Sequence, residues 1–274
     1  MPDATPSPSS AHPAAQLAQP AIADLVAESI RDRIISGELV EGDLLPRQEE
    51  MLRELNVSRP SYREALRILE AEGLISVRRG NRGGVVVHSP SQHTTTYTLG
   101  LLLRYRQVSL GDLSDAISEI EPLCAGVAAG LPDRHEKLIP ELNTLVDTQE
   151  RALGEAQEFT RIGREFHEAL VGGCGNMTLI STAGALAQLW SKQELEWADV
   201  VAANAAYPAV EQQRQVLQTH RMIVAAVAAG DRQQATNLAR AHSLASHHHV
   251  LEGRRDLTVI HPRSSRVPGR GTVG

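Results

Sequence analysis

The stretch that decides the fold of the N-terminal part of the chain is residues 55–88, which read LNVSRPSYREALRILEAEGLISVRRGNRGGVVVH. A helix is expected after the turn at residues 56–58, because the hydroxyl of Ser58 can accept hydrogen bonds from the free N–H groups of a first helical turn. Apolar residues then recur at helical spacing until Gly73, where the helix should end. Ser58 is therefore predicted to cap a helix that buries one face.

A β-hairpin is predicted directly after this helix. Residues 74–77 and 85–88 are β-prone, and they flank an arginine- and glycine-rich segment, residues 78–84. Upstream, periodic apolar residues predict two more helices, at about residues 22–34 and 51–55. Two short helices joined by a tight turn and followed by a hairpin are the layout of a winged helix-turn-helix, whose second helix enters a DNA groove.

Three arginines form a stripe on the predicted recognition helix. Arg59, Arg63 and Arg67 are spaced four residues apart, so on a helix they lie on one side, next to the apolar face. A guanidinium group can bind a phosphate, or O6 and N7 of a guanine, through two parallel hydrogen bonds. Arg59 and Arg63, near the helix start, are predicted to read bases, and Arg67 to contact the backbone. The alternative is an ordinary solvated face whose arginines pair with neighbouring carboxylates, namely Glu64, Glu70 or Glu72.

The distribution of charge along the chain supports DNA binding better than the net charge of the whole chain does. The net charge of −6 is unusual for a protein that binds a polyanion. Residues 21–90 hold ten arginines and twelve acidic residues, whereas residues 59–82 hold six arginines and three glutamates. Positive charge is therefore concentrated where the DNA is expected.

Length and composition allow two domains with separate cores, since the chain has 274 residues and is 42% apolar. Residues 1–20 and 253–274 are rich in Pro, Ser, Gly or Arg and are expected to be disordered tails. No apolar stretch approaches the ~20 residues of a membrane span. The first residues also lack the features of a secretory signal, so a soluble, cytoplasmic protein without membrane contact is expected.

The sequence patterns before residues 88–94 are typical of both helices and strands, whereas those after this segment are typical of helices alone, which indicates a domain boundary there. The DNA-binding domain is expected at residues 21–90 and a helical domain at residues 95–251. Six or seven helices are predicted in the latter, at about residues 95–106, 111–130, 134–153, 156–173, 177–201, 207–229 and 231–251. The predicted fold class is mainly α, a winged helix-turn-helix followed by an antiparallel all-α bundle.

The motifs of the first domain resemble the DNA-binding domain of the GntR family. The matching segments are residues 42–46, 55–59, 63–66, 69–75 and 79–84. The resemblance implies DNA contacts by Arg59, by Arg63 and by the wing around Arg79 and Gly80. With the reasoning above, the predicted DNA-binding set is Arg47, Ser58, Arg59, Arg63, Arg67, Arg79, Gly80 and Arg82. This chain departs from many relatives by carrying Arg47 and Gln48 after the proline instead of a Ser-Glu pair.

Three histidines of the second domain are candidate metal ligands. His167, His220 and His242 fall on three different predicted helices, and antiparallel packing can bring them together. Residues 118–122, 165–167, 219–220 and 241–242 resemble the FCD ligand-binding domain of the FadR branch, and the resemblance implies that these histidines bind a divalent metal ion of the zinc or nickel type. Metal-binding relatives usually carry an Asp four residues before the first histidine, where this chain has Gly163. Losing that carboxylate should weaken metal affinity and let an anionic effector complete the coordination sphere.

Other interpretations remain open at this point. The three histidines can instead be polar groups that line an effector pocket without a metal. A function of another class is a metal-dependent hydrolase with Glu165 or Glu168 as general base, although it gives the first domain no role. The histidines at positions 247–249 are predicted to be a solvated helix end.

The sequence as a whole predicts a transcription regulator, not an enzyme. A homodimer would bind double-stranded operator DNA that carries a short inverted repeat. A small-molecule effector, expected to be an organic or fatty acid type of carboxylate, would bind the helical domain and release the repressor.

Overall fold

The computed structural model describes residues 21–78, 84–204 and 206–259. The chain divides into two compact units, one within residues 1–91 and the other within residues 92–274.

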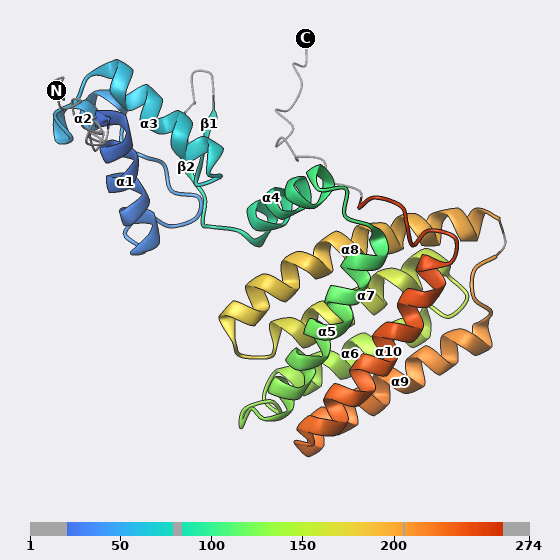
Figure 1. Ribbon diagram of the computed structural model, residues 1–274. Coiled ribbons are helices and arrows are strands. Elements are labelled where there is room, and N and C mark those ends of the chain that lie inside the picture. Colours follow the sequence, from blue (N-terminus) through green and yellow to red (C-terminus); the bar gives the residue numbers. More distant parts are fainter. Residues whose placement is uncertain (1–20, 79–83, 205, 260–274) are drawn as a thin grey trace, which may run out of the picture. The chain divides into compact units, whose positions relative to one another are not determined.

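The first unit is a small mixed domain. In the part that the structure describes, its elements are α1 (Ile22–Ile35), α2 (Gln48–Glu54), α3 (Arg59–Ala71), β1 (Ile75–Arg78) and β2 (Gly84–Val87). Side chains from all of them form one buried core, which includes Ile30, Met51, Tyr62, Leu69, Ile75 and Val87. Together α2, α3 and the two strands are the helix-turn-helix and hairpin that the sequence predicted (Figure 1).

Helix α3 begins as the sequence predicted. The side chain of Ser58 accepts a hydrogen bond from the backbone N–H of Ser61 at 3.3 Å. Pro60 lies in the first turn, where its missing N–H leaves no hydrogen bond unmade. The turn from α2 passes through Asn56 with φ at +50°, a left-handed conformation that asparagine tolerates better than most residues.

Strands β1 and β2 are antiparallel, with Ile75 opposite Val87 and Arg78 opposite Gly84. Leu44 makes an isolated antiparallel bridge to Val86, which ties the loop before α2 to the hairpin. The predicted wing tip, with Arg79, Gly80 and Arg82, lies outside the described residues.

The second unit is helical. The structure describes its helices as α4 (Gln92–Tyr105), α5 (Leu110–Ala129), α6 (Leu138–Arg151), α7 (Ala156–Gly172), α8 (Met177–Ala203), α9 (Val210–Ala229) and α10 (Arg232–Leu251). Helix α10 packs along α5, and α7 packs between α6 and α8 (Figure 1). The predicted mainly α fold class is confirmed.

A tight turn between α9 and α10 makes these two helices run antiparallel. Gly230 ends α9 with φ at +75°, a conformation that costs glycine little, and Asp231 caps α10 by accepting a hydrogen bond from Gln234 N at 2.9 Å. This turn places His220 of α9 and His242 of α10 at a similar height in the bundle.

Helix α6 starts later than predicted, at Leu138 instead of about residue 134. The guanidinium group of Arg134 donates hydrogen bonds to the backbone carbonyls of Leu131 and Ala228, and these contacts hold the preceding segment as a turn. Among the described residues, no helix is both long and apolar enough to span a lipid bilayer.

Candidate metal centre and nucleic-acid interface

Three imidazole rings meet inside the second unit. His167 comes from α7, His220 from α9 and His242 from α10, and all three are buried. Nε2 of His242 lies 3.1 Å from Nε2 of His167 and 2.9 Å from Nε2 of His220. The bundle therefore brings together residues that are up to 75 positions apart in the sequence.

The outer nitrogens of two of these rings have fixed partners. Nδ1 of His167 lies 2.8 Å from a carboxylate oxygen of Glu121, and Nδ1 of His220 lies 2.8 Å from the amide oxygen of Gln149. The amide oxygen can only accept a hydrogen bond, so Nδ1 of His220 carries the proton, and the carboxylate of Glu121 favours a proton on Nδ1 of His167 as well. The Nε2 atoms, which face one another, then carry lone pairs.

Burial keeps two of the three histidines, His220 and His242, neutral. Burial lowers the pKa of His242 to about 3, with the neighbouring His167 as a second cause. Burial also lowers the pKa of His220 well below its ordinary value, with the neighbouring His242 as a second cause. Burial opposes ionisation of Glu121, but the neighbouring His167 and Arg164 outweigh burial and lower the pKa of this carboxyl. Neutral imidazole is the form that binds metal ions.

These residues fit a divalent transition metal. Nε2 of His167 and Nε2 of His220 each direct a lone pair at Nε2 of His242. That nitrogen carries at most one proton, so it can donate a hydrogen bond to only one of them. A cation between the three Nε2 atoms would remove this conflict, and neutral imidazoles suit zinc, nickel and similar ions.

Gly163 lies one helical turn before His167, at the position where metal-binding relatives carry an Asp. A Cβ atom built on Gly163 would lie 2.7 Å from the amide nitrogen of Gln149. Gln149, on α6, therefore fills the space beside the histidines. Sequence reasoning missed this residue, because no periodicity or local motif connects α6 to the histidines.

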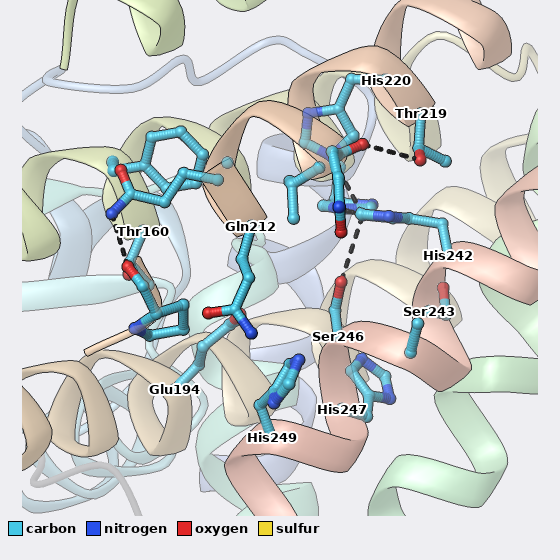
Figure 2. Close-up of a pocket in the computed structure, with 18 of the residues that line it drawn as sticks. Thr160, Glu194, Gln212, Thr219, His220, His242, Ser243, Ser246, His247 and His249 are labelled. Atoms are coloured by element: carbon cyan, nitrogen blue, oxygen red, sulfur yellow. Dashed lines mark hydrogen bonds between the residues drawn. The ribbon is translucent and has the colours of Figure 1, made fainter. Parts of the chain in front are cut away.

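A cavity of about 480 Å³ opens beside the three imidazoles (Figure 2). Its size is that of a small-ligand site. Hydroxyl, amide and acidic side chains line it together with the histidines, among them Thr160, Glu194, Gln212, Ser243 and Ser246. Apolar side chains such as Phe159, Trp197 and Val216 cover the remaining wall.

A buried ion pair forms one wall of this cavity. Nε of Arg164 lies 3.3 Å from a carboxylate oxygen of Glu194 and donates a hydrogen bond to Ser191 at 3.1 Å. Nη2 of Arg164 is buried and has no hydrogen-bond partner among the described residues. Oε2 of Glu194 is the oxygen of the ion pair, and its contact with Nε of Arg164 does not have hydrogen-bond geometry. Burial raises the pKa of Glu194, against the opposing charge of Arg164.

The expectation for the histidine run at positions 247–249 was wrong for its first member. His248 and His249 are exposed, but His247 is buried, with Nδ1 3.0 Å from the hydroxyl of Ser114 and 3.2 Å from that of Ser118. Consecutive residues of a helix point about 100° apart, so one of three neighbours reaches the inner face of α10.

The carboxylates named for a hydrolase do not lie at this site. Glu165 pairs with exposed Arg161, and Glu168 is exposed and accepts a hydrogen bond from Ser191. Neither of the two lines the cavity beside the histidines.

The predicted DNA-reading arginines point outward on the first unit. Arg59 and Arg67 have side chains that are 68% and 77% exposed, and Arg63 is exposed between them. Arg59 lies 3.9 Å from Glu49, which is a loose contact, whereas Arg67 donates to Glu64 at 2.9 Å.

The other carboxylates that could have neutralised the stripe are bound elsewhere. Glu72 pairs with Arg31 of α1, and Glu70 accepts a hydrogen bond from the backbone N–H of Val77. Among the described residues, no carboxylate forms an ion pair with Arg63. Arg47 is exposed at the N-terminus of α2.

Comparison with known proteins covers both units. The model of bacterial regulatory proteins of the gntR family matches residues 22–87, and the FCD domain model matches residues 112–245. The HTH-type transcriptional repressor NanR of Cronobacter sakazakii is 27% identical over 234 residues, which are 82% of this chain and 84% of the relative. The NanR repressor of Klebsiella aerogenes is 29% identical over 175 residues, 62% of this chain and 65% of the relative.

Among solved structures, Streptococcus agalactiae GntR shares the fold. Its TM-score is 0.63 at 22% sequence identity, and the match covers 81% of this chain and 97% of that one.

Proposed function

The chain belongs to the gntR family of bacterial regulatory proteins, in the group with a C-terminal FCD domain, and from this premise we propose that it is a repressor that a small metabolite releases from its operator. The relatives that it resembles over most of its length are repressors by name. Residues 21–90 bind DNA, and residues 95–251 bind the effector and form the homodimer. The protein works in the cytoplasm, where the operator is accessible.

The observation that carries the DNA-binding function is the outward stripe on α3. A capped helix presents Arg59 and Arg63 to solvent without a close carboxylate partner, so both guanidinium groups are available to base edges or phosphates. In a two-fold symmetric dimer, two copies of α3 enter successive major grooves and select an inverted repeat.

The test is the substitution Arg63→Ala. Binding of the purified full chain to its operator is measured by fluorescence anisotropy, with the operator first selected from genomic fragments. Loss of a bidentate base contact should cost about 1–3 kcal/mol at each half-site, roughly 5- to 150-fold in affinity for each, and relax the preference at one base position of each half-site. Arg151→Ala, at an exposed arginine of the second unit, is the matched control and should bind normally. Unchanged sequence-specific binding by Arg63→Ala would contradict the proposal.

The effector site is the cavity beside the histidines. His167, His220 and His242 would hold a divalent metal, which supplies a positive charge and open positions for ligand oxygens. The three imidazoles contribute no negative charge, so a carboxylate is the ligand group that best complements the metal.

The ion pair in the cavity wall narrows the class of effector. Nη2 of Arg164 needs an acceptor, because it is buried without a hydrogen-bond partner among the described residues. Oε2 of Glu194 lies 3.3 Å from Nε of Arg164 but outside hydrogen-bond geometry, so it can still accept a hydrogen bond from a ligand. A small acid that also carries a hydroxyl group satisfies both, which makes a hydroxylated carboxylic acid the proposed effector class. A thermal-shift comparison of hydroxy acids with their deoxy analogues tests this, and an equal shift for the members of each pair would contradict it.

A further inference from the structure

The amide group of Gln149 has a defined orientation. This side chain is 1% exposed, and its nitrogen donates a hydrogen bond to the backbone carbonyl of Phe159 at 3.1 Å. The amide oxygen therefore faces the other way, where it lies 2.8 Å from Nδ1 of His220. An oxygen can only accept, so Nδ1 of His220 must carry the proton and its Nε2 must carry the lone pair.

Gly163 is the residue that makes this arrangement possible. A Cβ atom at position 163 would lie 2.7 Å from the amide nitrogen of Gln149, closer than real Cβ atoms approach a heavy atom. Gln149 cannot simply swing aside, because both ends of its amide group are hydrogen-bonded. A side chain at position 163 and the present position of Gln149 exclude each other.

We infer that Gln149 is a positioning residue of the three-histidine centre, and that Gly163 and Gln149 act as one unit. Gln149 holds His220 as the Nδ1–H tautomer with its Nε2 lone pair directed at the other two histidines, and it closes the place from which a carboxylate at position 163 would reach them. The centre thereby keeps neutral ligands only and leaves the remaining coordination to an oxygen of an anionic effector. The part of this inference that concerns coordination rests on the proposed function, whereas the tautomer of His220 does not.

Gln213 provides a matched control. It is buried in the same cavity wall, and both ends of its amide group are hydrogen-bonded too, but to two backbone groups, the N–H of Gly154 at 2.9 Å and the carbonyl of Pro208 at 2.7 Å. It makes no hydrogen bond to a histidine among the described residues. Gln213→Ala should therefore lower stability in the same way as Gln149→Ala without changing the histidines.

The first experiment reads the tautomer by long-range ¹H–¹⁵N NMR on the full chain, labelled at histidine and stripped of metal. His220 is expected as the Nδ1–H tautomer in the wild type and in Gln213→Ala, and as a mixture or the Nε2–H tautomer in Gln149→Ala. Gln149→Glu keeps an acceptor for Nδ1 and should restore the wild-type tautomer. An unchanged tautomer in Gln149→Ala, or the same change in Gln213→Ala, would overturn the inference whether or not the protein binds metal.

The second experiment measures zinc affinity by competition with a chelator. Gln149→Ala should bind zinc about 10- to 100-fold more weakly, the usual effect of losing an outer partner of a metal ligand, while Gln149→Glu and Gln213→Ala stay near the wild type. Gly163→Asp alone should also bind weakly, because its side chain meets Gln149. The double variant Gly163→Asp/Gln149→Ala should bind more tightly than either single variant.

The two experiments separate the two proposals. If the wild type takes up no zinc but Gln149→Ala changes the tautomer, the metal part of the proposed function fails and the positioning role stands. If zinc binds and Gln149→Ala matches Gln213→Ala in affinity, the metal stands and the positioning role is overturned.

Discussion

His247 illustrates how a single residue can differ from its neighbours in a run of identical side chains. It is buried against the ring of Trp190, with a ring-centroid distance of 4.2 Å, while the two histidines after it are exposed. The environment, set by the face of α10 on which each residue falls, decides the chemistry. His247 is also part of the cavity lining, so its neutral form shapes the proposed effector site.

The pH dependence of stability should reveal His247. Burial is the main cause that lowers its pKa to about 3, with Arg164 and His167 adding to the effect and Glu121 opposing it. The pKa of a histidine in an unfolded chain is about 6.5. Between these two pKa values the unfolded chain binds a proton at this residue that the folded chain does not. The free energy of unfolding therefore has its full value above pH 6.5 and decreases as the pH falls toward 3.

Substitution of this residue gives the measurement. Urea unfolding of the second unit is followed through the two tryptophans, Trp190 and Trp197, at several pH values between 7.5 and 4.5. Below pH 6.5 the wild type should lose up to about 1.4 kcal/mol per pH unit more than His247→Gln. His248→Gln, at the exposed neighbour, should keep the wild-type slope. Parallel curves for His247→Gln and the wild type would refute the assignment.

At the scale of elements, the sequence predicted the helices, turns and strands better than it predicted the contacts between them. The capped start of α3, the turn through Asn56 and the pairing of β1 with β2 follow from residues that are neighbours in the sequence. The helices of the second unit also follow from apolar periodicity, with an error of a few residues where Arg134 holds a turn.

The candidate metal centre was predictable only in part. A family resemblance pointed to the three histidines, whereas the contact between Gln149 and His220 joins residues 71 positions apart and leaves no periodic signal. The sequence showed that a glycine, Gly163, stands where metal-binding relatives carry a carboxylate. It did not show that the side chain of Gln149 from α6 occupies the space beside this glycine, because that depends on how the helices pack.

Helix α3 gives a prediction about salt dependence. Arg67 lies toward the C-terminal part of the exposed stripe and is expected to meet phosphate, with its exposed pair to Glu64 contributing little because solvent screens it. Arg67→Ala should weaken binding to all sequences alike and reduce the slope of log affinity against log salt by about 2, because the dimer loses one phosphate contact in each half-site. Arg63→Ala should instead change the preference at one base position. Anisotropy titrations at several salt concentrations, with operator and scrambled DNA, distinguish the two, and a loss confined to operator DNA in Arg67→Ala would contradict a phosphate contact.

At the scale of the whole molecule, the two units must be coupled if the protein is a regulator. The second unit carries the cavity and the candidate metal centre, and the first carries the arginine stripe. An effector can release DNA only if it binds the DNA-free form more tightly than the DNA-bound form. The size of this difference is the coupling free energy, and it is the same from either side.

This reciprocity yields a test that needs no knowledge of how the units are arranged. The hydroxy acid that gives the largest thermal shift should lower operator affinity by a factor in the range of about 5 to 150, and operator DNA should weaken binding of that acid by the same factor. Removal of metal by a chelator should abolish both effects together, since the acid would lose the cation that binds its carboxylate. Anisotropy gives the first factor and calorimetry of the preformed DNA complex gives the second. A chelated protein that still releases DNA in response to the acid would show that the histidines serve the cavity as polar groups without a metal. A factor of one in both titrations would show that binding of the acid is not coupled to binding of DNA, and would contradict the proposed release.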